Sequence, residues 1–300
     1  MSARDRDRDG GRNRNGDRNG DRNGRRSGAR QGGFTLVELV IVMVLVGVVG
    51  SLGATFIARA TEMYRASAAR AQLADEADLT VRRLSRDLAG ALANSVRVVA
   101  ADGGTYVEFV PVLSAGRYRA FASFGAEPTG NDPLEFHANP PDTSFQLIGP
   151  PADVPAGSSL VIYNLGIGAG DVYAGTNRRV PTSVGTGLGT VSFNPGGANF
   201  PLDSPERRFY VVATPVSYFC APDGRLLRYS GYPWSAAQPT VGSGGLAAAT
   251  VSRLAASTSA CSFELDPGLA NIGSVLIRLA LGRDGEVVTL SQQVNLDATP

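Results

Sequence analysis

The sequence predicts an α+β protein in which a long N-terminal helix, transmembrane in its first part, packs on an antiparallel β-sheet domain. Residues 39–58 contain no charged side chain, and 20 residues are about enough to cross ~30 Å of hydrocarbon as a helix. Residues 73–92 place apolar side chains at steps of three and four, the period of a helix face. From residue 96 onward, short runs rich in β-branched and aromatic residues replace that period.

Residues 1–33 form a basic leader with ten Arg and five Asp. Its apolar side chains are limited to Met1, Ala3 and Ala29, so it cannot bury a core, and we expect it to be disordered. An Arg/Gly tail that binds nucleic acid is the alternative interpretation. The interspersed Asp residues and the whole-chain charge of +1 argue against it, and we expect no nucleic-acid partner.

Residues 34–58 are the predicted transmembrane segment. The apolar run is longer than that of an ordinary secretory signal. Six Arg precede it within residues 14–33, and three follow within residues 59–78. The positive-inside rule then places the N-terminus in the cytoplasm and the rest of the chain outside, in the bacterial periplasm. Glu38 enters this run although a carboxylate in hydrocarbon is costly.

Residues 59–94 read as an amphipathic continuation of the same helix, which we expect to span residues 34–93. They are rich in good helix formers, and the chain has no Pro before residue 111. The predicted buried stripe consists of Leu73, Ala77, Val81, Leu84, Leu88 and Leu92. Within the membrane segment, Gly47, Gly50 and Gly53 favour close approach of a second helix or are simply tolerated there.

Residues 95–300 are the predicted β-rich periplasmic domain. Residues 96–112 indicate a hairpin that turns at Asp102-Gly103, and residues 272–296 a second hairpin that turns at residues 282–285. Residues 158–165, 190–193, 207–220 and 225–230 are further expected strands. The Gly- and Pro-rich stretches 125–157, 164–189 and 233–246 are interpreted as surface connections.

Cys220 and Cys261 are the two cysteines of the chain. Two thiols are too few for a structural zinc site. In a cytosolic domain they would be buried small hydrophobic residues, whereas in an exported domain they would form one disulfide. The predicted topology favours the disulfide.

The sequence offers no catalytic constellation. The single histidine, His137, has no nucleophile pattern near it, and no phosphate-binding or metalloprotease motif is present. The Asp- and Asn-bearing loops do not have the spacing of an EF-hand. We therefore expect no catalytic residue, no metal and no cofactor, and a periplasmic enzyme is the disfavoured alternative.

The stretch "GGFTLVE", residues 32–38, resembles the processing site of type IV prepilins and type II secretion pseudopilins. The resemblance covers about residues 28–58. It implies that a prepilin peptidase cuts after Gly33 and N-methylates Phe34, and that Glu38, at mature position five, acts in assembly. It also implies a type IV pilin-like fold and partners among other pilins, through the N-terminal helix in the inner membrane.

A weaker resemblance extends into the outer domain. The stretches "PVSYFC", "LLRYSGY" and "SQQVNLDATP" are similar to MshO-type minor pilins of the mannose-sensitive haemagglutinin (MSHA) pilus. The leader is unusually long for that family, and the absence of a helix proline fits a minor pilin better than a major one. We therefore expect a minor pilin of an MSHA-like type IV pilus. The alternatives are a J-type pseudopilin of type II secretion, a PilW-like minor pilin, or a membrane-anchored periplasmic binding module or adhesin.

Overall fold

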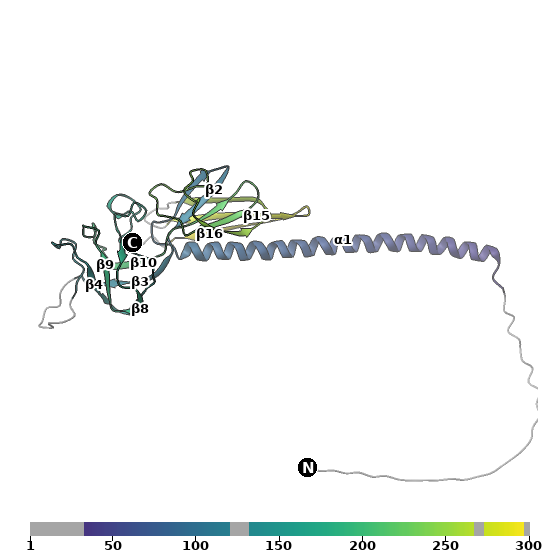
Figure 1. Cartoon of the computed structure of the whole chain (residues 1–300). Helices are drawn as coiled ribbons and strands as arrows, with labels where there is room; N and C mark the ends of the chain where they lie inside the picture. The colour runs from purple at the N-terminus through teal and green to yellow at the C-terminus, as the bar shows by residue number, and fades with distance from the viewer. Residues whose placement is uncertain (1–32, 121–131, 267–272, 297–300) are drawn as a thin grey trace, which may run out of the picture. The chain divides into compact units, whose positions relative to one another are not determined.

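The computed structural model describes residues 33–120, 132–266 and 273–296. The predicted leader lies outside these residues apart from Gly33. The chain divides into two compact units, Met1–Arg59 and Ala60–Pro300. The predicted fold class is confirmed: a long apolar N-terminal helix is followed by antiparallel sheets, which makes the protein α+β and pilin-like (Figure 1).

Helix α1 (Leu36–Ala89) is 54 residues long and shorter than the predicted 34–93. At its C-terminal end, Gly90 is the first residue outside the helix, as expected from its low helix propensity. The Leu92 amide then donates to the Val110 carbonyl at 2.8 Å rather than continuing the helix. Leu92 is buried as predicted, but among residues of a different cluster from the helix stripe.

The second half of α1 supplies one side of the main core. Five of the six predicted stripe residues are buried on the helix, and they pack against Phe109 and Tyr218 of one sheet and Ile277 of another. Figure 1 shows β2, β15 and β16 running beside this part of α1. The helix residues concerned are Leu73, Ala77, Val81, Leu84 and Leu88.

The first sheet has five strands in the order β1-β2-β11-β12-β13. The predicted hairpin is confirmed, because Arg97 pairs with Glu108 and Ala101 with Gly104. Asp102 and Gly103 have φ of 55° and 75°, as a two-residue turn of type I′ requires. The strands are β1 (Arg97–Ala101), β2 (Gly104–Phe109), β11 (Val216–Cys220), β12 (Leu226–Ser230) and β13 (Thr250–Ala255).

The second sheet has three strands, β14 (Thr258–Asp266), β15 (Ser274–Arg283) and β16 (Glu286–Asn295). The predicted C-terminal hairpin is present, but its turn is shorter than residues 282–285. Gly282 and Arg283 pair with β16, which leaves Asp284 and Gly285 as the turn with φ of 53° and 85°. Left-handed φ at both positions favours the two-residue form.

A closed barrel of six strands is inserted between β2 and β11, which pair with each other. Its interior is filled by aromatic and aliphatic side chains, including Phe145, Phe193 and Phe209. Figure 1 shows the labelled barrel strands grouped together at the end of α1 where the helix meets the sheets. In barrel order the strands are β10 (Arg208–Val212), β3 (Val112–Tyr118), β4 (Ser144–Ile148), β9 (Thr190–Asn194), β7 (Arg178–Pro181) and β6 (Ser159–Ile162).

The barrel corrects two sequence predictions. The single strand expected over 207–220 is two strands in different sheets, β10 and β11, with Pro215 between them; Pro has no N–H to donate to a ladder. The stretches 125–157 and 164–189 are not plain connections. They contain β4 and β7 of the barrel, the short pair β5 (Ala152–Val154) and β8 (Gly185–Leu188), and the 3₁₀ turn η1 (Gly168–Gly170).

Candidate functional site

The Gly33–Phe34 bond precedes the first turn of α1. Gly33, Phe34 and Thr35 have no regular secondary structure, and the Phe34 side chain is 77% exposed. A Cβ built at Gly33 would meet no atom within 4 Å. Packing among the described residues therefore imposes no requirement for glycine at this position.

Thr35 caps the helix, and the sequence analysis missed this role. Its Oγ1 accepts a hydrogen bond from the Glu38 amide at 3.2 Å, and its carbonyl accepts from the Leu39 amide at 3.1 Å. Thr35-x-x-Glu38 has the spacing of a capping box, so the sequence did contain the signal. The cap explains why α1 begins at Leu36 rather than at Phe34.

Glu38 lies in the first turn of α1, where a carboxylate interacts favourably with the helix dipole. Its side chain is exposed, and within the described residues its carboxylate has no hydrogen-bond or ion-pair partner. The structure thus accounts for the Glu38 amide through Thr35, while the carboxylate remains available to a group outside the described chain.

The helix surface that follows is apolar on every side. An 18-residue window of α1 has a mean hydropathy of 2.5 with none of it buried, so the helix is long and apolar enough to cross a membrane. The two hydroxyl side chains of residues 39–58 bond to the helix itself, Ser51 Oγ to the Val48 carbonyl at 2.8 Å and Thr55 Oγ1 to the Leu52 carbonyl at 2.9 Å. That pairing satisfies both hydroxyl donors without water, as lipid requires.

The cleavage-site residues, the helix cap and the start of the apolar helix all lie in one short segment that matches a known family motif. Residues 28–54 match the prokaryotic N-terminal methylation motif. This is the prepilin-type motif, and it supports a type IV pilin-like or pseudopilin protein. The methylation motif contains Gly33, Phe34 and Glu38 and implies processing by a prepilin peptidase and assembly with pilins in general. The apolar helix is consistent with the single-pass membrane anchor of a pilin.

Comparison with curated proteins and with solved structures gave no match. The methylation motif therefore carries the family-level argument, and it covers the N-terminal segment only.

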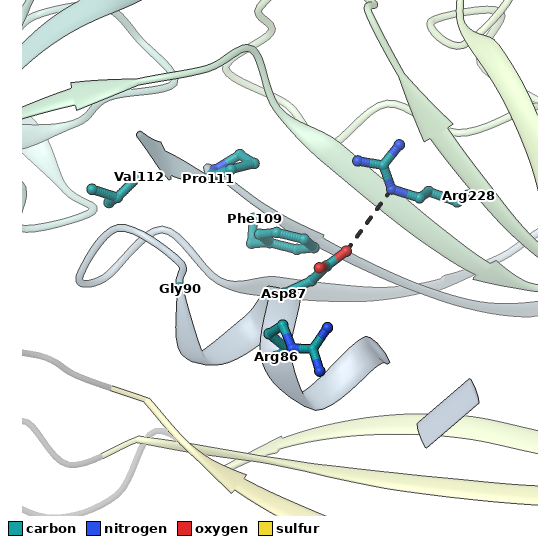
Figure 2. Close-up of a pocket in the computed structure, with 7 residues that line it drawn as sticks. All are labelled: Arg86, Asp87, Gly90, Phe109, Pro111, Val112 and Arg228. Carbon is teal, nitrogen blue, oxygen red and sulfur yellow. Dashed lines mark ion pairs between the residues drawn. The ribbon is translucent and has the colours of Figure 1, made fainter. Parts of the chain in front are cut away.

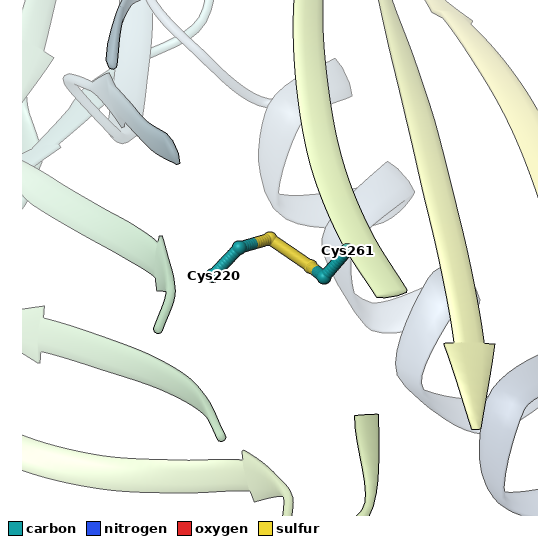
Figure 3. The surroundings of a disulfide bond; sticks show 2 residues. All are labelled: Cys220 and Cys261. Carbon is teal, nitrogen blue, oxygen red and sulfur yellow. A yellow bond between two sulfur atoms is a disulfide. The ribbon is translucent and has the colours of Figure 1, made fainter. Parts of the chain in front are cut away.

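The structure joins Cys220 on β11 to Cys261 on β14 in a disulfide (Figure 3). Their Cα atoms are 5.5 Å apart, and they are separated by 41 positions in sequence. The bond links the five-stranded sheet to the three-stranded sheet. Cys220 belongs to the core that contains the buried stripe of α1, and Cys261 packs against that core.

A buried polar network, which the sequence analysis did not identify, connects the first sheet to the barrel insertion. Glu108 is 1% exposed and pairs with Arg97, whose Nε lies 2.5 Å from Oε2. Tyr232 donates to Glu108 Oε1 at 2.8 Å and contacts Ser217 Oγ at 2.8 Å. The Arg97 guanidinium stacks on Tyr173 of the insertion, 3.6 Å from its ring centre. The predicted hairpin places Arg97 opposite Glu108 by register, so this much was readable from sequence.

A second set of hydrogen bonds fixes the insertion to the chain that leaves α1. Asn94 Nδ2 donates to the Asn164 carbonyl at 2.9 Å, and Asn164 Nδ2 donates to the Ala93 carbonyl at 2.7 Å. The Tyr173 hydroxyl donates to the Ser95 carbonyl at 2.7 Å. These bonds are nonlocal, because they join positions about 70 to 80 residues apart, and they act in positioning the barrel rather than in chemistry.

His137 and the acidic loops do not assemble into a site. Among the residues that the structure describes, no group of three or more His, Cys, Asp or Glu side chains could hold a metal ion. Part of the loop considered for calcium, residues 130 and 131, lies outside the described ranges.

Proposed function

We propose that this protein is a minor pilin of an MSHA-like type IV pilus, a structural and assembly subunit that is first held in the inner membrane and then incorporated into a filament. Residues 1–33 are its leader, and prepilin peptidase removes them. Phe34 is then the methylated N-terminus. The observation that carries the proposal is the match of residues 28–54 to the prepilin-type methylation motif, placed directly on an exposed apolar helix.

Glu38 is the proposed assembly residue. Cleavage creates a cationic α-amino group on Phe34, and methylation leaves it charged. The exposed Glu38 carboxylate has no partner among the described residues, and an unpaired charge is costly in lipid. Pairing between the Glu38 carboxylate and the cationic N-terminus of a neighbouring subunit compensates both charges. This pairing explains why a carboxylate is retained in an apolar run.

The prepilin-type motif supports a structural subunit over a catalyst. The core of residues 60–300 is filled by apolar side chains, and the polar network around Glu108 connects sheet and insertion. In this proposal the N-terminus is cytoplasmic, and residues 95–300 form the periplasmic domain. A J-type pseudopilin or a PilW-like minor pilin would share the same motif, and a membrane-anchored adhesin would share the anchor without entering a filament.

The test is the composition of sheared filaments. Cells that produce the protein at its native level are sheared, and the filament fraction is probed by immunogold labelling and quantitative mass spectrometry. The proposal predicts the mature chain in filaments at a small ratio to the major subunit, and its loss from that fraction when the filament is not assembled. Mature protein that stays wholly in the inner membrane while filaments form normally would contradict it.

A further inference from the structure

A cavity of about 220 Å³ lies where the end of α1 meets the five-stranded sheet (Figure 2). Figure 2 shows Arg86 and Arg228 on either side of Asp87, with the Phe109 ring beside the carboxylate. Pro111, from the connection between β2 and β3, and Val112, the first residue of β3, continue the apolar part of its lining. The cavity therefore combines two guanidinium groups, one carboxylate and an apolar wall.

The carboxylate of Asp87 is already engaged. It accepts a hydrogen bond from the Tyr218 hydroxyl at 2.5 Å. Burial and this bond raise the pKa of Tyr218, so the hydroxyl stays a donor. Arg228 Nε is 4.0 Å from Asp87 Oδ2, close enough for an ion pair but too far for a hydrogen bond. Arg228 Nε is buried and has no acceptor among the described residues.

Arg86 is exposed, and it has no ion-pair partner within the described ranges. The cavity thus contains two positive groups and one negative group, an excess of one positive charge. A buried donor without an acceptor is costly, and charge-assisted bonds from guanidinium to carboxylate are among the strongest in proteins. The chemistry that fits the cavity is a carboxylate on a short apolar stem.

A second cavity, of about 410 Å³, lies on the other side of Arg86, between α1 and β16. Its lining includes Ser85 and Gln292. Ser85 Oγ is also buried without a partner among the described residues. Two adjacent cavities that share Arg86 form a strip longer than a small acid. A segment of polypeptide matches it better.

We propose that the Arg86–Arg228 cavity receives an aspartate or glutamate side chain from a neighbouring subunit, with the flanking peptide lying over Arg86 toward Ser85. This inference rests on the proposed function and specifies a contact of the outer domain, distinct from the membrane contact of Glu38. The carboxylate accepts from the guanidinium groups of Arg86 and Arg228 and neutralises the excess charge.

The chain contains no lysine, which makes a sharp test possible. Arg86→Lys introduces the single ε-amine of the protein and preserves the charge. Membranes and sheared filaments from cells with full-length R86K are treated with a carbodiimide, which joins an amine to a carboxylate in direct contact. Arg83→Lys is the matched control, because Arg83 is exposed on the same helix but lines neither cavity. Tandem mass spectrometry identifies the residue joined to the introduced amine in each variant.

We expect about tenfold more intermolecular product from the R86K variant than from the R83K variant, since a charge-assisted contact is worth at least that factor in occupancy. The joined residue should be one Asp or Glu of one subunit. Adding Arg228→Gln to R86K should reduce the product. A charge swap should restore the intermolecular product. In that experiment this chain carries Arg86→Glu, and a lysine replaces the mapped carboxylate residue of the partner.

Equal product from both variants, links only to Asp78 or Asp87 of the same chain, or links spread over many proteins would overturn the proposal. Cleavage at Gly33 is measured in the same samples. Normal cleavage and filament entry without the intermolecular product of R86K would reject the cavity contact alone, whereas an uncleaved leader would reject the proposed function.

Discussion

Residues 36–59 and residues 60–89 belong to one helix, yet their apolar side chains have opposite surroundings. In the first half no residue is buried, and Leu45 is 57% exposed. In the second half one stripe is buried, and Leu84 is 0% exposed against two sheets. Helix propensity is satisfied in both halves, so the difference comes from what covers the apolar surface. The sheets of the chain cover the apolar side chains of the second half. The apolar side chains of the first half are exposed, and lipid or other helices could cover them.

The same substitution should therefore destabilise the protein in the second half of the helix and have no effect on its stability in the first. Leu84→Ala removes a fully buried side chain from the outer unit, residues 60–300. We expect a loss of about 3–5 kcal/mol in the free energy of unfolding of this unit. Leu45→Ala should leave that value unchanged. Denaturant unfolding of the detergent-solubilised full chain measures both. Comparable losses for the two variants would show that the first half also packs on the outer unit.

The disulfide lies in the outer unit, which also contains the second half of α1. Replacing Cys220 and Cys261 together by serine should lower the free energy of unfolding of the outer unit by roughly 3–4 kcal/mol, because the bond closes a long loop in the unfolded chain. Cleavage at Gly33 should be unaffected. Thiol alkylation of the wild-type protein on non-reducing gels is the companion measurement, and two freely alkylated thiols in periplasmic protein would contradict the bond.

Glu38 belongs to the first region only. Glu38→Gln preserves size and removes the charge, so insertion, cleavage and unfolding of the outer unit should all be normal. The variant should nevertheless be depleted from sheared filaments, by about tenfold if one pairing of ~1.4 kcal/mol is lost. Quantitative immunoblots of membrane and filament fractions measure this. A normal ratio in filaments would mean that the charge has no assembly role.

Glu108 provides the smallest expected effect, and that effect is confined to the outer unit. Burial raises its pKa above the ordinary 4.5, although Arg97 and Tyr232 oppose the shift. A carboxyl with a raised folded pKa contributes most stability below its unfolded pKa and loses that contribution as pH rises through the folded value. The difference in unfolding free energy between wild type and Glu108→Gln should therefore fall as pH rises above about 4.5. A difference independent of pH would contradict the shift.

The parts of the fold that could be predicted from sequence are those fixed by local signals. Asp102-Gly103 and Asp284-Gly285 encode tight turns through left-handed φ, and the stripe from Leu73 to Leu88 encodes the buried helix face. Of the N-terminal site, Gly33, Phe34 and Glu38 were readable as a motif. Thr35 was equally readable as a cap, because a threonine three residues before a glutamate is the spacing of a capping box.

The barrel could not be predicted because its strand pairings are nonlocal and because its strands lack a strong alternation of apolar and polar residues. Strand β3 pairs with β10, with Arg117 opposite Arg208, about 90 positions away. Short barrel strands such as β4 and β7 lie in Gly- and Pro-rich sequence that resembles connections. The Arg86–Arg228 cavity depends on elements far apart in the chain, so neither arginine is distinguishable in sequence from an ordinary exposed one.

Mass spectrometry of the N-terminal peptide tests whether the chain is cleaved after Gly33 and methylated on Phe34. Membrane protein from cells with an active prepilin peptidase should begin with N-methylated Phe34, and residues 1–33 should be absent from it. Gly33→Leu should retain the leader with an unchanged outer unit, since a Cβ at that position meets no atom within 4 Å. Recovery of chains that still carry residues 1–33, or of an unmodified N-terminus at another position, would contradict the account.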